Sequence, residues 1–283
     1  MKNKIWSLAM IMTTSMVILV SSNAHMEEYN PNQEEIDNQS KTVYTGEYNR
    51  QNINKEKISI EYLVNTYYEK ANEAYYSKNY QEAIEKYTKV IELNSNCMEA
   101  YYGRGNAYYY LGKYNEAIGN YTKVIEAHPN DITIYYARAN AYYHMKKYNE
   151  AVSDYNKIVS VIQEDIEIFF SRGTSYYNLG MYEKAIEDYD KATEINPKFI
   201  DAYYGKGTAY YQLKNYLKAI ESYDKMIELS PGSIEAYYGK GSSYYQLKNY
   251  AEALKSFNKI IEINPNDKTA YIWRDKCREL MGQ

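Results

Sequence analysis

The chain of 283 residues repeats itself every 34 residues, and this period constrains its fold more than any other feature. Six tyrosines follow the period from Tyr80 to Tyr250, and six alanines follow it three positions later, from Ala83 to Ala253. A proline recurs near the end of four of the units: Pro129, Pro197, Pro231 and Pro265. Residues 64–267 therefore hold six units without an insertion. A period of this length predicts a stack of helical hairpins, an architecture that typically binds partners rather than catalyses reactions.

Each unit carries the patterns of two amphipathic helices. In the first helix of the fifth unit, Tyr203, Gly207 and Tyr210 share one face, and in its second helix Ala219 and Tyr223 do so. A glycine costs about 1 kcal/mol in a helix relative to alanine, so we expect close helix contact to offset that cost. The chain has 39 tyrosines and 4 phenylalanines. This preference predicts that hydroxyls reach polar partners at the edges of the layers.

These residues give the chain a family resemblance, because the repeat resembles the tetratricopeptide repeat (TPR). The sixth unit supplies the family's pattern at eight positions: Tyr237, Gly241, Tyr244, Tyr250, Ala253, Phe257, Ile260 and Pro265. The departures are few: Ala74 replaces an aromatic residue, and Ser95 and Gln163 replace proline. The resemblance implies an all-α, right-handed α-solenoid of six TPR helical hairpins plus a C-terminal cap helix, with the first helices lining a concave groove.

The sequence divides into a head segment, the repeats and a cap. We expect a signal peptide at 1–24, a disordered polar linker at 25–57, TPR repeats within 58–267 and a capping helix at 268–283. The six repeats are expected at 64–97, 98–131, 132–165, 166–199, 200–233 and 234–267. Within 1–24, two lysines precede an apolar run at 5–20, and Ala24 ends a small-residue cleavage site. An uncleaved N-terminal membrane anchor is the alternative, so we expect an exported protein, secreted or periplasmic, or one held at a membrane by this segment.

Three rows of first-helix residues are expected to line the groove, because positions i, i+4 and i+7 share one helix face. The first row is Tyr68, Tyr102, Tyr136, Phe170, Tyr204 and Tyr238. The middle row is Asn72, Asn106, Asn140, Thr174, Thr208 and Ser242. The third row is Tyr75, Tyr109, Tyr143, Tyr177, Tyr211 and Tyr245. Aromatic and amide groups suit an extended peptide. The alternative is that the second tyrosine of each pair, in the first and third rows, packs between adjacent layers.

The middle row yields a specific expectation. If its amides hold a peptide backbone, Asn106→Ala combined with Asn140→Ala weakens partner binding and leaves the melting temperature nearly unchanged. A cationic stripe also follows the period: Arg104, Arg138, Arg172, Lys206 and Lys240. We interpret it as side chains lying along neighbouring helices, with a binding site for an anionic partner as the alternative.

Sites for chemistry are not evident in the sequence. The net charge of -4 argues against nucleic-acid binding. The three histidines are too scattered for a metal cluster, and Cys97 and Cys277 are too far apart along the stack to form a disulfide. We therefore predict a protein that is not an enzyme, uses no cofactor and binds a protein or peptide partner. The alternative is a self-associating or membrane-tethered structural assembly factor without a free peptide ligand.

Overall fold

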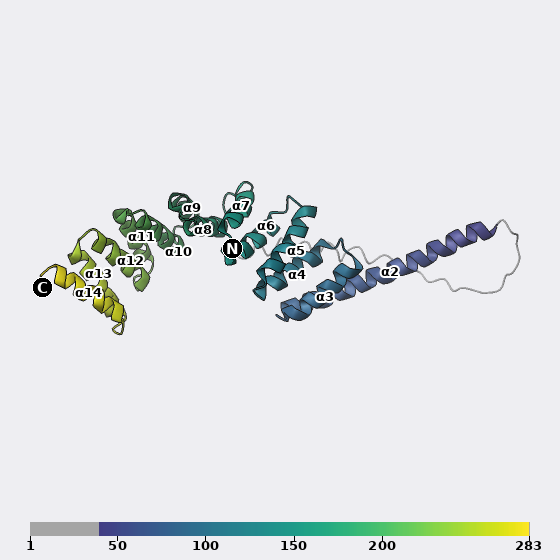
Figure 1. The fold of residues 1–283 in the computed structure, drawn as a ribbon, viewed down its shortest axis with the longest axis horizontal. Coiled ribbons are helices and arrows are strands. Elements are labelled where there is room, and N and C mark those ends of the chain that lie inside the picture. The colour runs from purple at the N-terminus through teal and green to yellow at the C-terminus, as the bar shows by residue number, and fades with distance from the viewer. Residues whose placement is uncertain (1–39, 283) are drawn as a thin grey trace. The chain divides into compact units, whose positions relative to one another are not determined.

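The computed structural model describes residues 40–282, with the side chains of residue 57 and of residues 59–282 (Figure 1). Every regular element in this part of the chain is a helix, so the predicted all-α repeat fold is confirmed. The helices are α2 (Ser40–Tyr76), α3 (Tyr80–Leu93), α4 (Met98–Tyr110), α5 (Tyr114–Ala127), α6 (Ile132–His144), α7 (Tyr148–Val159), α8 (Ile166–Asn178), α9 (Tyr182–Ile195), α10 (Ile200–Gln212), α11 (Tyr216–Leu229), α12 (Ile234–Gln246), α13 (Tyr250–Ile263) and α14 (Lys268–Leu280). The expected signal peptide lies outside the described residues.

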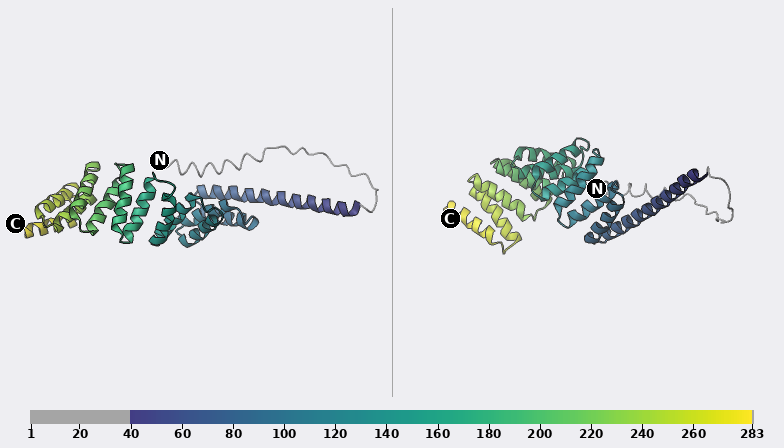
Figure 2. Two further views of the ribbon diagram at one scale, coloured as in Figure 1. Left: turned by 90° about the horizontal axis from the view of Figure 1, so that it is seen from above. Right: turned by 45° about the vertical axis from the view of Figure 1, so that its right-hand side comes forward.

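The described residues divide into two compact units, one that ends at Ala100 and one that begins at Tyr101. In the first unit α2 packs along α3 and continues beyond it toward its N-terminus (Figure 2). This corrects the linker expected at 25–57 from Ser40 onward, because α2 begins there, and the rest of that linker lies outside the described residues. The segment is too polar to bury itself, but a helix satisfies its backbone hydrogen bonds internally and needs no apolar cover. Ser40–Tyr76 contains no proline, so nothing in its backbone interrupts that ladder.

In the second unit first and second helices alternate, and from α5 to α14 each helix packs against the next. The core of this stack is a row of aromatic rings on the second helices. Tyr223 of α11 lies between Gly207 of α10 and Gly239 of α12, and a Cβ added at these glycines would lie 2.6 Å and 2.3 Å from its ring. Real Cβ atoms do not approach so closely, so the ring fixes the spacing of three consecutive helices.

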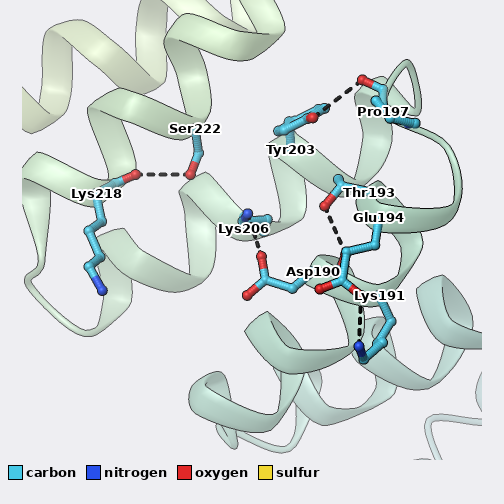
Figure 3. Close-up of polar contacts among 9 residues, drawn as sticks. All are labelled: Asp190, Lys191, Thr193, Glu194, Pro197, Tyr203, Lys206, Lys218 and Ser222. Atoms are coloured by element: carbon cyan, nitrogen blue, oxygen red, sulfur yellow. Dashed lines mark hydrogen bonds and ion pairs between the residues drawn. The ribbon is translucent and has the colours of Figure 1, made fainter.

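The turns and loops repeat as regularly as the helices. Each first helix is followed by a residue in the left-handed region, which is Gly112 or Gly180 in two hairpins and a lysine such as Lys214, with φ 57°, in others. At the far end of the hairpin, the hydroxyl of Tyr203 donates to the carbonyl oxygen of Pro197 at 3.3 Å (Figure 3). The equivalent tyrosines Tyr135 and Tyr271 make the same bond. These bonds confirm that hydroxyls reach polar partners at the layer edges.

The last helix covers the apolar end of the second unit. Trp273 of α14 stacks on Phe257 of α13, with ring centroids 6.0 Å apart and ring planes 19° apart. Asp275 occupies the position that is glycine or alanine in the six repeats, and it forms ion pairs with Arg274 and Arg278. This charged face lacks the small residue against which a second helix packs, so the pattern of stacking cannot continue beyond α14.

The packing of the second-helix rings gives a direct test. We expect Gly207→Ala to destabilise the protein by about 1–3 kcal/mol, because its methyl group overlaps the Tyr223 ring. Gly119→Ala is the matched control, since it also lies inside a helix but no heavy atom is within 4 Å of its added Cβ. We expect that control to stabilise the protein by about 0.5–1 kcal/mol through helix propensity. Urea unfolding of both variants measures the difference, and equal effects would contradict the proposed packing.

Candidate functional site

The three rows predicted to line a groove lie on the first helices, and we call their surface the first-helix face. In the second unit these side chains are half-buried, with one exception. Tyr204 of α10 is 43 % exposed. The face therefore combines partly covered rings with short polar side chains and is neither a sealed core nor a fully solvated surface.

The asparagines of the middle row are bonded within their own hairpins. The hydroxyl of Tyr121 donates to Oδ1 of Asn106 at 2.8 Å, and that of Tyr155 donates to Oδ1 of Asn140 at 2.6 Å. In the first unit, the hydroxyl of Tyr87 makes the same bond to Asn72 at 2.6 Å. Each buried tyrosine thus places its hydroxyl on an amide oxygen, which satisfies a polar group that burial would otherwise penalise.

The same amides also interact with the first row. Burial raises the pKa of Tyr102, and the side-chain hydrogen bond with Asn106 opposes the rise. Burial likewise raises the pKa of Tyr136, against the side-chain hydrogen bond with Asn140. The amide oxygens of Asn106 and Asn140 therefore each have a partner inside the protein. We therefore expect replacement of these asparagines to lower stability, in place of the nearly unchanged melting temperature expected from the sequence, because the hydroxyls of Tyr121 and Tyr155 would lose their acceptors.

From α8 onward the middle row changes to short hydroxyl side chains. The hydroxyl of Tyr189 donates to Thr174 at a long 3.4 Å, and the hydroxyl of Thr208 donates to the backbone carbonyl of Gly205 at 2.9 Å. In the last repeat the ring is Phe257, which has no hydroxyl to place, and the middle row is Ser242. Amide and tyrosine therefore occur together in the early repeats and are both absent from the last one.

The third-row tyrosines pack against the second helix of their own hairpin. The rings of Tyr109, Tyr143, Tyr177, Tyr211 and Tyr245 meet the first ring of the following helix edge to face at 5.3–5.5 Å. Some are also linked to the next repeat, since Gln246 donates through Nε2 to the Tyr211 hydroxyl at 3.2 Å. His144 stacks on Tyr114 at 5.0 Å with ring planes 5° apart. This row therefore has a packing role, made within each hairpin rather than between layers alone.

The cationic stripe lies on another face of the same helices, where four of its five members pair with carboxylates and Arg104 donates to the amide oxygen of Asn120. Arg138 donates to both carboxylate oxygens of Asp154 at 2.8 Å, and Arg172 binds Asp188 in the same way. In the following two repeats Lys206 pairs with Asp190 (Figure 3) and Lys240 pairs with Asp224. These four charges are matched by carboxylates, which disfavours an anionic partner at the stripe.

The start of the first helices forms an acidic edge of the first-helix face. Residues 162–168, 196–202 and 230–236 carry five carboxylates and one lysine: Glu164, Asp165, Glu167, Asp201, Glu235 and Lys198. Glu167, Asp201 and Glu235 occupy the same phase and are exposed. None of the three rows contains a lysine or arginine between α4 and α12. The face is therefore neutral to acidic from end to end.

Comparisons with known proteins identify the repeat. Models of the TPR repeat match residues 71–112, 105–146 and 173–214, and models of the tetratricopeptide repeat match residues 132–165, 200–233 and 234–267. The chain belongs to the tetratricopeptide repeat family. The latter three ranges coincide with repeat boundaries predicted from the sequence.

Solved structures of TPR proteins share the fold. The crystal structure of YrrB, described as a TPR protein with an unusual peptide-binding site, is 25 % identical, with a TM-score of 0.59 over 68 % of this chain and 100 % of that one. A crystal structure of MamA is 28 % identical, with a TM-score of 0.56 over 58 % of this chain and 96 % of that one. A tetratricopeptide repeat protein from Parabacteroides merdae is 23 % identical, with a TM-score of 0.62 over 77 % and 87 %, and supports the fold alone. No curated protein is significantly similar to the chain.

Other chemistry is not apparent in the described part of this TPR protein. Residues 40–282 contain no group of three or more His, Cys, Asp or Glu side chains placed to hold a metal ion. Cys97 and Cys277 are both free. No helix among these residues is long and apolar enough to cross a membrane. The matching families are repeat families, and none of them is a family of enzymes.

The bonds of the middle row give a first prediction for this face. We expect Asn106→Ala combined with Asn140→Ala to destabilise the protein by about 1–3 kcal/mol per site, because each leaves a buried tyrosine hydroxyl without its acceptor. The matched control is Thr208→Ala combined with Ser242→Ala, since neither residue accepts a tyrosine hydroxyl, and we expect a much smaller loss. Urea unfolding at one protein concentration compares the two pairs, and similar losses would refute the structural role of the amides.

The buried ion pairs give a second prediction, in which pH has a definite sign. Burial raises the pKa of Asp188, and Arg172 opposes the rise. Arg172→Leu removes that opposition and leaves a buried carboxylate unpaired, so we expect a loss of about 3–5 kcal/mol at pH 7. A carboxyl whose pKa is higher in the folded state destabilises the fold as pH rises from its unfolded to its folded pKa. Acidification through that window therefore restores stability to the variant.

The control for this experiment removes both charges. Arg172→Leu combined with Asp188→Leu leaves no unpaired charge, so we expect it to be closer to wild type at pH 7 and to lose the extra pH dependence. Urea unfolding at pH 7 and pH 5 compares the variants. A single variant that is as stable at pH 7 as at pH 5 would rule out the buried carboxylate as the cause.

Proposed function

We propose that this TPR protein is an exported, non-catalytic scaffold that binds an extended segment of a peptide or protein on its first-helix face. The observation that carries the proposal is the first row, in which Tyr102, Tyr136, Phe170, Tyr204 and Tyr238 expose part of their rings at one phase of five successive first helices. Tyrosine supplies a large contact area at a low cost in conformational entropy. The similarity to YrrB, which is described as having a peptide-binding site, supports the same reading.

The proposed export rests on the first residues of the sequence. Lys2 and Lys4 precede an apolar run, and small residues precede His25, which is the pattern of a cleaved signal peptide. Protein recovered outside the cytoplasm should then have a mass that begins at His25. Recovery of the intact chain in a membrane fraction would instead favour the uncleaved anchor.

Self-association is the second candidate function, and the first unit contains an observation that favours it. The side chains of Ile60, Tyr62 and Leu63 on α2 are 45 %, 70 % and 39 % exposed. Ile60 and Leu63 are three residues apart and share one face of α2, and such an apolar face can pack against a second copy of itself. The measured mass of the purified protein in solution distinguishes this candidate from a scaffold that is a monomer.

The binding proposal is tested with a C-terminally tagged full chain as bait in an extract of the native extracytoplasmic fraction. We expect a partner to be retained by the wild type and weakened at least about tenfold by Tyr204→Ala, because an exposed aromatic ring is a typical centre of binding energy. Leu217→Ala is the matched control, since Leu217 is 64 % exposed but lies on a second helix, α11. Absence of any partner, together with a mass above that of one chain, would replace the scaffold proposal with self-association.

A further inference from the structure

The hydroxyl of Tyr223 differs from those of the tyrosines at the equivalent position of the other second helices. The hydroxyls of Tyr121 and Tyr155 donate to asparagines, and that of Tyr189 donates to Thr174. Within the described part of the chain, the Tyr223 hydroxyl forms no hydrogen bond. Its middle-row neighbour is Thr208, whose hydroxyl donates to the backbone carbonyl oxygen of Gly205 and accepts no bond from Tyr223.

This hydroxyl reaches solvent even though the residue is 2 % exposed. No fully buried side-chain nitrogen or oxygen among the described residues lacks a hydrogen-bond partner. The unpartnered Tyr223 oxygen is therefore not fully buried and must open onto the surface. The Tyr223 ring cannot move away from this position, because Gly207 and Gly239 contact it from both sides. The hydroxyl is consequently a fixed polar group that a partner can meet without rearranging the fold.

The neighbourhood of this hydroxyl is the most open part of the first row. The rings of Tyr102, Tyr136, Phe170 and Tyr238 each pack on the second-helix ring of their own hairpin at 5.8–6.3 Å. Tyr204, which belongs to the same hairpin as Tyr223, makes no such contact and is 43 % exposed. Burial raises the pKa of Tyr223, and the nearby Tyr204, Tyr177 and Tyr211 raise it further. The Tyr223 hydroxyl is therefore close to three tyrosines of the first-helix face.

Carboxylates outnumber cations around this opening, and Lys198 is the one lysine of the same acidic edge. Asp201 lies three residues before Tyr204 in α10, and Glu167 and Glu235 occupy the same phase in α8 and α12. The nearest cationic row is Lys206 and Lys240, and both of these lysines are paired with aspartates of the second helices. A carboxylate row beside an exposed ring favours a lysine or arginine side chain, which can lie over the ring and pair with the acid.

We propose that the Tyr223 hydroxyl, the Tyr204 ring and the Asp201 carboxylate form the contact that fixes the position of a basic, extended peptide segment on α8, α10 and α12. The hydroxyl donates to a backbone carbonyl oxygen of the segment. The ring covers the stem of a lysine or arginine side chain, and Asp201 pairs with its head group. This inference rests on the proposed function and adds to it the class of partner and the place where it binds.

The test uses the full chain and two labelled ten-residue probes, one alternating lysine with alanine and the other alternating glutamate with alanine. Fluorescence anisotropy at physiological salt measures their dissociation constants. We expect the lysine probe to bind and the glutamate probe not to bind. We expect Tyr223→Phe to weaken the lysine probe about fivefold, the effect of losing one hydrogen bond, and to leave stability unchanged. Phe257 shows that the ring fits this phase without a hydroxyl.

Two further variants separate binding from folding. Thr208→Asn supplies the internal acceptor that Asn106 and Asn140 supply elsewhere, so we expect weaker binding and a more stable fold. Tyr155→Phe removes a hydroxyl that is already satisfied inside the protein, so we expect lower stability and unchanged binding. This opposite pattern in the two hydroxyl deletions is the signature of the proposed contact.

The inference is overturned if the lysine probe does not bind, if the glutamate probe binds as tightly, or if Tyr223→Phe binds the lysine probe like the wild type. The proposed function has its own outcome, which is capture of a natural partner that Tyr204→Ala loses. Capture that is unaffected by Tyr223→Phe overturns this inference and leaves the scaffold proposal standing. Absence of a captured partner counts against the scaffold proposal itself.

Discussion

The contact on which the rest of the structure depends is the aromatic ring of a second helix held between small residues of two first helices. Tyr223 between Gly207 and Gly239 shows it most clearly, and Tyr189 between Gly173 and Gly205 repeats it. Because one ring touches its own hairpin and the next, it sets the spacing within and between repeats at once. An insertion would move the ring away from one of the two small residues. A period without insertions follows from this requirement.

A tyrosine in that position also introduces a hydroxyl, and the residue of the middle row differs according to how this hydroxyl is satisfied. An asparagine receives it in the early repeats, a threonine receives it weakly at Tyr189, and phenylalanine removes the need in the last repeat. The charged residues of the first helices are likewise satisfied by partners on the second helices. Arg138 and Arg172 face an aspartate sixteen residues later, whereas Lys206 and Lys240 face one sixteen residues earlier. Each of these cations has one carboxylate, so the layers remain close to neutral.

Periodicity made the helices, the repeat boundaries and the small residues predictable, because each is visible in one unit and checked by five others. Periodicity did not reveal which side chains of neighbouring helices contact a given residue. Helical phase places Asn106 on a face, but the hydroxyl of Tyr121 approaches it from another helix, fifteen residues away. The pairs of Arg138 and Arg172 were missed for the same reason. The N-terminal part of α2 was missed because low apolar content argues against burial, and a solvated helix does not require burial.

Different atoms of the second-helix rings serve packing and hydrogen bonding. The ring carbon atoms are required everywhere, since they space the layers. The hydroxyl is required only where something accepts it, and Phe257 shows that the stack forms without one. The Tyr223 hydroxyl is held at the surface without an acceptor among the described residues. In the proposed contact its acceptor comes from outside the chain, and the acidic, aromatic surroundings favour a cationic partner.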